Sequence, residues 1–141
     1  MNELSRRRRA LMAAAKKGKS DMNGWTDGVA YTDLTIVENS YVAPDGAISS
    51  YNGWSRTGFV PCGGAVSITF PPLGQNYAGD PRFNYFYNSA NASSASRVQQ
   101  ITLSKTQSKT IAVPSTAKYF VISSTTSGLI NCVNAGIIPN A

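Results

Sequence analysis

The sequence predicts an all-β protein, an antiparallel β-sandwich or jelly roll, preceded by a short N-terminal helical arm. Three observations support this fold class. The chain after residue 20 is rich in Ser, Thr, Asn, Gly, Tyr and Val and has few strong helix formers. Short apolar segments recur along it, separated by Gly, Pro and Asn. The 141 residues suffice for one domain with its own hydrophobic core.

The first 20 residues differ from the rest of the chain in charge. They hold seven basic residues and one acidic residue, and seven minus one gives a net charge of +6. Residues 21–141 hold six basic and six acidic residues and are neutral. A basic segment is therefore joined to a neutral body, and the two are expected to meet different partners.

The basic segment also carries the signals of a helix. Asn2 is a suitable N-cap, residues 10–15 are strong helix formers, and Gly18 is a good residue to follow the last turn. The domain organisation predicted from these features is a basic helical anchor arm over residues 1–20, a hinge over 21–28 and a β-sandwich domain over 29–141.

The first strands of the body are predicted from alternation and from turn residues. Pro44-Asp45-Gly46 predicts a hairpin, because proline presets φ and glycine accepts a positive φ. Asn52-Gly53 is a second turn signal. Val66, Ile68 and Phe70 alternate with polar residues before two prolines end the strand. The strands predicted in this half of the chain are 29–38, 41–43, 47–49, 57–61 and 66–70.

The second half of the body follows the same pattern. Residues 83–87 have aromatic side chains at both alternating positions, which predicts a central strand. Residues 88–96 have no apolar periodicity and are expected to form an exposed loop. The remaining predicted strands are 98–103, 110–113, 118–123 and, as the final one, 129–134.

The two cysteines, Cys62 and Cys132, leave two interpretations open. They are either buried small apolar residues or the two halves of one disulfide. The chain has no histidine to complete a zinc site, and we expect no metal and no cofactor. No apolar run reaches 18 residues, so no membrane-spanning helix is predicted, and residues 10–15 are too short an apolar core for an export signal.

Catalysis is not expected. Without histidine, neither a Ser–His nor a Cys–His nucleophile pair can be assembled. A glycosidase needs two opposed carboxylates, and several of the acidic residues here fall in turn-like contexts, such as Asp45 and Asp80. Asp27, Asp33 and Glu38 are the alternative set that could meet in space, but they are expected to be solvated charges of strands and loops. The sequence therefore predicts a non-enzymatic protein.

Three residues near the Asn-Gly turn are the candidates for ligand binding: Tyr51, Trp54 and Arg56. An exposed aromatic ring at a turn can stack on the face of a sugar, so we expect a glycan contact here. The competing interpretation places Trp54 in the core of the sandwich, where large aromatic residues often dominate.

The basic arm has three interpretations. It is expected to dock as an anchor helix on other protein subunits; alternatively, its arginines neutralise nucleic-acid phosphates, or the helix lies on a membrane surface. The alanines on its apolar face make the membrane the weakest of the three. The residues predicted to carry the anchoring are Leu4, Arg6, Arg7, Arg8, Arg9, Leu11, Lys16 and Lys17.

Three stretches together resemble small structural proteins of tailed phages and prophages of gut bacteria. The first runs from Leu4 to Gly18 and continues at Trp25-Thr26-Asp27-Gly28. The second runs from Ser50 to Cys62 and contains Gly53-Trp54-Ser55-Arg56-Thr57-Gly58-Phe59-Val60-Pro61, which is similar to a Gly-Trp-Ser-x-Thr-x-Phe-x-Pro run. The third joins Phe86-Tyr87-Asn88-Ser89 to Val113-Pro114-Ser115-Thr116-Ala117-Lys118-Tyr119, although Asn88 stands where an aspartate is usual.

The resemblance implies a virion component, assembled in the bacterial host cytoplasm. It implies a decoration, fibre, tail or baseplate subunit whose outward jelly roll is similar to carbohydrate-binding modules. The partners it implies are other virion proteins (capsid, portal, tail or baseplate), further copies of the chain in a homo-oligomer such as a trimer, and glycans of a host surface. The alternatives are a capsid protein whose arm contacts DNA and a freestanding lectin-like module.

Overall fold

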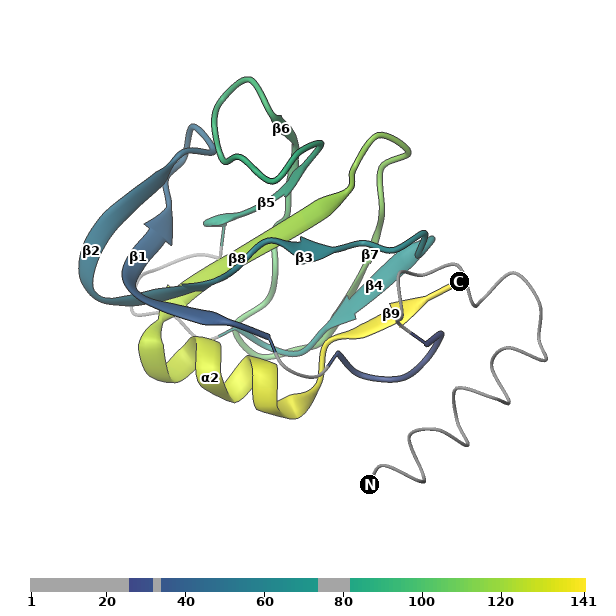
Figure 1. The fold of residues 1–141 in the computed structure, drawn as a ribbon. Coiled ribbons are helices and arrows are strands. Elements are labelled where there is room, and N and C mark those ends of the chain that lie inside the picture. Colours follow the sequence, from purple (N-terminus) through teal and green to yellow (C-terminus); the bar gives the residue numbers. More distant parts are fainter. Residues whose placement is uncertain (1–25, 32–33, 74–81) are drawn as a thin grey trace.

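The computed structural model describes residues 26–31, 34–73 and 82–141, which form mostly antiparallel β-sheet with one short helix (Figure 1). The predicted anchor arm and residues 21–25 of the predicted hinge lie outside the described residues. Within the described part of the chain, no helix is long and apolar enough to cross a membrane.

The larger sheet has six strands, arranged in the order β1-β2-β8-β5-β6, with β3 also paired to β8. All of its pairs are antiparallel. Strand β8 is central because it pairs with β2, β3 and β5. The strands of this sheet are β1 (Ile36–Val42), β2 (Ile48–Thr57), β3 (Val60–Pro61), β5 (Asn84–Tyr87), β6 (Arg97–Gln100) and β8 (Tyr119–Thr125).

The smaller sheet has three antiparallel strands in the order β7-β4-β9. They are β7 (Lys109–Ala112), β4 (Ser67–Phe70) and β9 (Ile138–Asn140). The start of the described chain lies beside β9, since the N–H groups of Gly28 and Tyr31 donate to the carbonyls of Pro139 and Ile137, both at 2.8 Å. The last residue of the segment predicted as a hinge is thus hydrogen-bonded to the β-domain.

The two sheets pack on each other around one main core. On β4, Ile68 and Phe70 are fully buried and alternate with half-buried polar residues, as the sequence pattern predicts. The ring of Phe70 meets that of Phe120 on β8 edge to face, with centroids 5.3 Å apart. Tyr31 contacts Phe120 from another side at 5.7 Å. Residues from both sheets therefore share a single apolar interior.

The predicted hairpin and the predicted central strand are both confirmed. Strands β1 and β2 pair through the turn at residues 44–46, where Gly46 has a φ of +89°. All four residues of β5 are buried, because Tyr85 and Tyr87 face a second apolar cluster on the opposite side of the sheet from Phe86. The hydroxyl of Tyr87 donates to the carbonyl of Gly46 at 2.6 Å, and that of Tyr85 donates to the carbonyl of Pro44. These two side chains attach the hairpin turn to the sheet.

The prediction of a final strand over residues 129–134 is wrong. This segment belongs to the helix α2 (Thr126–Ala135), and the last strand is β9. The hydroxyl of Thr125 accepts from the N–H of Gly128 as an N-cap, and Gly136, with a φ of +104°, follows the last turn. Leu129 and Cys132, three positions apart, are buried on one helix face. The β-branched and apolar residues of this run are typical of a strand, but its two buried residues have the spacing of one helix face.

Both cysteines are free and buried in the main core. The Cys132 Sγ lies 3.7 Å from the carbonyl oxygen of Pro71. Burial raises the pKa of each thiol from 9.0 to about 12, because the apolar interior disfavours the thiolate. In this structure both residues act as small apolar side chains.

We expect both thiols to resist a soluble thiol reagent in the native protein near pH 8 and to react fully in denaturant, because only an accessible thiolate attacks. Because burial disfavours the thiolate, the two thiols leave the stability of the fold unaffected by pH below about pH 9 and lower it as the pH rises from 9 towards 12. Thiol titration with and without urea, together with urea unfolding at neutral and alkaline pH, measures both effects. Fast labelling of the native protein would contradict the placement of both residues in the core.

Candidate functional site

The pairing of β1 with β2 is interrupted by a wide bulge. Glu38 is paired with Ser55 and Ser40 with Ser50, so the single residue Asn39 lies opposite the four residues 51–54. Asn39 has a φ of +56° and Gly53 a φ of +88°, the left-handed region that Asn and Gly tolerate best. The Asn52-Gly53 signal therefore forms a bulge within β2, where the sequence analysis predicted a turn between strands.

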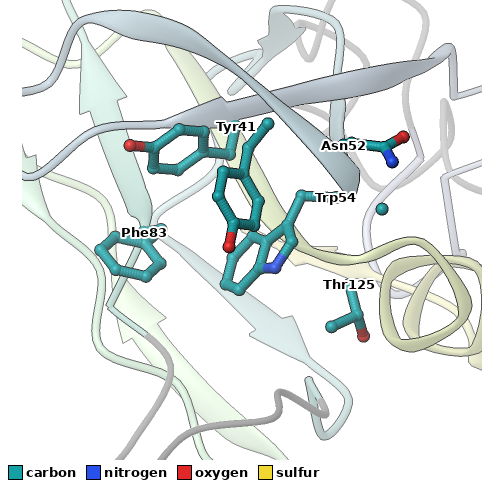
Figure 2. A pocket seen from close by; sticks show the side chains of 7 residues that line it. Tyr41, Asn52, Trp54, Phe83 and Thr125 are labelled. Carbon is teal, nitrogen blue, oxygen red and sulfur yellow. The ribbon is translucent and has the colours of Figure 1, made fainter.

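The bulge forms one wall of a surface pocket of about 590 Å³. The other walls come from β1, from the residue before β5 and from the end of β8. Figure 2 shows the rings of Tyr41, Trp54 and Phe83 gathered on one side, with the polar side chains of Asn52 and Thr125 on the other. The residues that line the pocket are Tyr41, Tyr51, Asn52, Gly53, Trp54, Phe83 and Thr125.

Four aromatic rings in the pocket contact one another edge to face. The centroids of Tyr41, Trp54 and Phe83 lie 5.4 to 5.9 Å apart, so that each ring touches the other two. Tyr51 adds contacts of 5.9 Å to Tyr41 and 6.4 Å to Trp54, yet it remains 60% exposed. Edge-to-face contact places the positive edge of one ring against the negative face of the next, which is favourable. The four rings together form an apolar surface that is open to solvent at Tyr51.

Three polar side chains of the pocket are neutral and make no hydrogen bond to the described part of the protein. Within the described part of the chain, the hydroxyls of Tyr41 and Tyr51 and the side-chain amide of Asn52 make no hydrogen bond to the protein. None of the described residues that line the pocket is Asp, Glu, Lys or Arg. The pocket thus offers uncharged donors and acceptors next to aromatic faces.

Thr126, the first residue of α2, holds the bulge in place. Its hydroxyl donates to the carbonyl oxygen of Gly53 at 3.2 Å. The Ser55 hydroxyl lies 2.8 Å away and, because the Thr126 proton is already used, donates to the Thr126 oxygen. One hydroxyl therefore connects the helix to both the bulge and the regular part of β2.

A buried polar network holds the opposite walls. The hydroxyl of Ser123 on β8 accepts from the N–H of Val42, at 3.1 Å, and donates to the carbonyl oxygen of Phe83. Asn84 accepts from the N–H of Ser123 at 2.9 Å and donates to the carbonyl of Ile101 at 3.2 Å. These bonds fix the backbone next to Tyr41 and at Phe83, so two aromatic walls are set by side chains beneath the pocket.

We expect Thr126→Val to lower the free energy of unfolding by about 1–2 kcal/mol, because the change leaves the Ser55 hydroxyl and the Gly53 carbonyl without their partner. It should also alter the emission of Trp54. Thr126→Ser, which keeps the hydroxyl, should restore both. Urea unfolding and fluorescence, in a Trp25→Phe background that isolates Trp54, measure the effects. An exposed control, Thr116→Val, should change neither quantity.

The structure brings together two of the three predicted contact residues. Tyr51 and Trp54 both line the pocket, and Trp54 is half-buried there and absent from the core clusters. Arg56 does not line it: its Nε donates to the Ser40 hydroxyl at 2.8 Å and one Nη to the Thr57 carbonyl at 3.1 Å. Burial lowers the pKa of Arg56, because the partly buried position disfavours the charged guanidinium. Its surroundings are thus those of a structural residue.

Sequence reasoning missed the remaining walls of the pocket. Tyr41 lies on β1, Phe83 was assigned to a central strand, and Thr125 lies where β8 meets α2. The clustering of aromatic residues along the chain was the only available signal, and it does not say which rings meet.

The other predicted site residues cannot be placed in the same way. The anchoring residues lie outside the described residues: Leu4, Arg6, Arg7, Arg8, Arg9, Leu11, Lys16 and Lys17. Among the described residues, no three His, Cys, Asp or Glu side chains gather as a group able to hold a metal ion.

No family model, no curated protein and no solved structure matches this chain.

Proposed function

We propose that this protein is a non-enzymatic structural subunit of a phage particle, which displays a jelly-roll domain that binds glycans. The aromatic pocket of the β1–β2 bulge is the observation that carries the proposal. Its rings and its neutral hydrogen-bonding groups lie on different sides of one pocket of about 590 Å³, within the range of about 300–1,000 Å³ typical of small-ligand sites.

This arrangement matches the two-sided chemistry of a sugar. A pyranose ring has an apolar face of C–H groups and a rim of hydroxyls, so it pairs with an aromatic surface and with polar groups beside it. Tyr51 supplies an exposed ring, and the amide of Asn52 can both donate and accept. The pocket is already formed by hydrogen bonds of the protein, so binding does not have to order it.

The particle-bound role rests on the sequence. All the net charge of the chain lies in residues 1–20, whereas the β-domain is neutral, which suits an attached arm and a displayed body. The stretch from residue 50 to 62 that resembles phage structural proteins includes the bulge and the pocket residues Tyr51 and Trp54. The proposed partners are virion proteins, further copies of the chain and a host-surface glycan, and the proposed location is the virion.

Two full-length variants separate the two activities. In one, Arg6, Arg7, Arg8 and Arg9 are replaced by alanine, and in the other Tyr51 is replaced by alanine. The arm variant should no longer sediment with particles that lack this subunit but should still bind host-surface polysaccharide. Tyr51→Ala should show the reverse. This opposite pattern would support an anchor and a separate display site.

The alternatives give different results in the same experiment. A DNA-associated capsid protein would show DNA binding that falls steeply with salt and is lost in the arm variant. A freestanding lectin would bind polysaccharide normally in the arm variant and would never sediment with particles. If neither variant differs from the original protein in either assay, the proposal fails.

A further inference from the structure

We infer that the pocket of the β1–β2 bulge selects uncharged saccharides and rejects acidic ones such as uronic acids. This inference rests on the proposed glycan binding and names the ligand class of that same site. It depends on three properties of the pocket: its charge, its free hydrogen-bonding groups and the exposure of its rings.

The first property is the neutrality of the lining. None of the seven described residues that line the pocket is Lys, Arg, Asp or Glu. Arg56, the only cationic residue of β2, turns its guanidinium to Ser40 and Thr57. A sugar carboxylate bound against the rings would lose hydration without gaining a cation from these lining residues, which is unfavourable.

The second property is the supply of neutral partners for hydroxyl groups. Among the described residues, the hydroxyls of Tyr41 and Tyr51 and the amide of Asn52 make no bond to the protein. Each hydroxyl both donates and accepts, and the amide has two donors and one acceptor oxygen. Uncharged sugars present the same mixture, whereas a carboxylate only accepts.

The third property is the ring surface. Tyr51 is the most exposed aromatic residue among the large apolar side chains of the described chain, at 60%, and it contacts Tyr41 and Trp54 beside the pocket. A sugar stacked on this ring can extend towards Asn52. Such binding comes from apolar contact and neutral hydrogen bonds, so it should be insensitive to ionic strength.

The test uses the full-length protein and matched pairs of ligands. Each pair is a neutral sugar and the same sugar with its C6 hydroxymethyl group replaced by a carboxylate: methyl glucoside and methyl glucuronide, methyl galactoside and methyl galacturonide, methyl mannoside and methyl mannuronide. Homodisaccharides of each series extend the set. Saturation-transfer NMR and titration of the Trp54 emission, in the Trp25→Phe background, report binding at low and high NaCl.

At least one neutral ligand should bind, and its acidic counterpart should bind at least about tenfold more weakly. The neutral affinity should change by less than about twofold with salt. Tyr51→Ala should weaken it by about tenfold or more. Val66→Ala, which removes apolar surface from a residue that is 67% exposed and outside the pocket, should leave it unchanged.

Two results would overturn the inference in distinguishable ways. If the acidic sugars bind as tightly as the neutral ones, or more tightly with strong salt dependence, the charge selection is wrong while glycan binding stands. If no sugar of either series binds, both the inference and the glycan part of the proposed function fail. Particle attachment through the arm is measured separately and is unaffected by either result.

Discussion

Replacing Phe120 by alanine is expected to lower the free energy of unfolding by about 3–5 kcal/mol. Phe120 is fully buried on β8, the strand that pairs with β2, β3 and β5. Its ring contacts Phe70 of the smaller sheet at 5.3 Å and Tyr31 at 5.7 Å. The substitution would remove the ring contact between Phe120 and Phe70, which links the two sheets, and leave a cavity that a central strand cannot easily close.

Urea unfolding followed by far-UV circular dichroism measures this change. A loss of that size is a large part of the roughly 5–15 kcal/mol that stabilises a typical domain, so the variant should be partly unfolded at 37 °C. Val66→Ala removes apolar atoms from a side chain that is 67% exposed and should cost less than about 0.5 kcal/mol. A cost below about 1 kcal/mol for Phe120→Ala would mean that the two sheets do not share this core.

Replacing Asn84 by leucine should cost about 2–4 kcal/mol, although the two side chains are similar in size. Asn84 is fully buried, accepts from the N–H of Ser123 and donates to the carbonyl of Ile101. Leucine would leave both backbone groups buried without these partners, and each carries a desolvation cost. The damage should reach the pocket, since Phe83 precedes Asn84 and its carbonyl is bound by Ser123.

The same unfolding experiment measures the stability of this variant, and the Trp54 emission reports on the pocket. Asn134→Leu, at an exposed position of α2, is the matched control and should be nearly neutral. If Asn84→Leu is as stable as the original protein, the polar network beneath the pocket does not contribute to the fold. If stability falls but the Trp54 emission and ligand binding are unchanged, the network does not position the aromatic walls.

Much of the β architecture could be predicted because its causes are local. Alternation at residues 66–70 reflects one face turned to the core and one turned away, and β4 has that pattern. The doubly apolar segment 83–87 predicted a central strand, and β5 is buried on both faces. Pro44-Asp45-Gly46 placed the hairpin, because a turn depends on the φ values of its own residues.

The same local reasoning failed for α2. Residues 129–134 contain Ile and Val, which favour strands, yet Leu129 and Cys132 are buried with helical spacing and Thr125 and Gly136 cap the ends. The gain from burying that face against the core outweighs the weak intrinsic preference of β-branched residues. A short apolar run satisfies both periodicities, and only packing decides between them.

The sequence by itself determined the β-rich character of the body and the concentration of charge in residues 1–20, and it singled out Tyr51 and Trp54, which both line the pocket. The tertiary structure alone decided that the Asn52-Gly53 signal makes a bulge, that Tyr41 and Phe83 join the same pocket, and that Arg56 turns away from it. The physical reason is that turn preferences and alternation act between neighbours in sequence. The walls of a pocket depend on strand register and on side-chain hydrogen bonds between distant segments, such as those of Thr126 and Ser123.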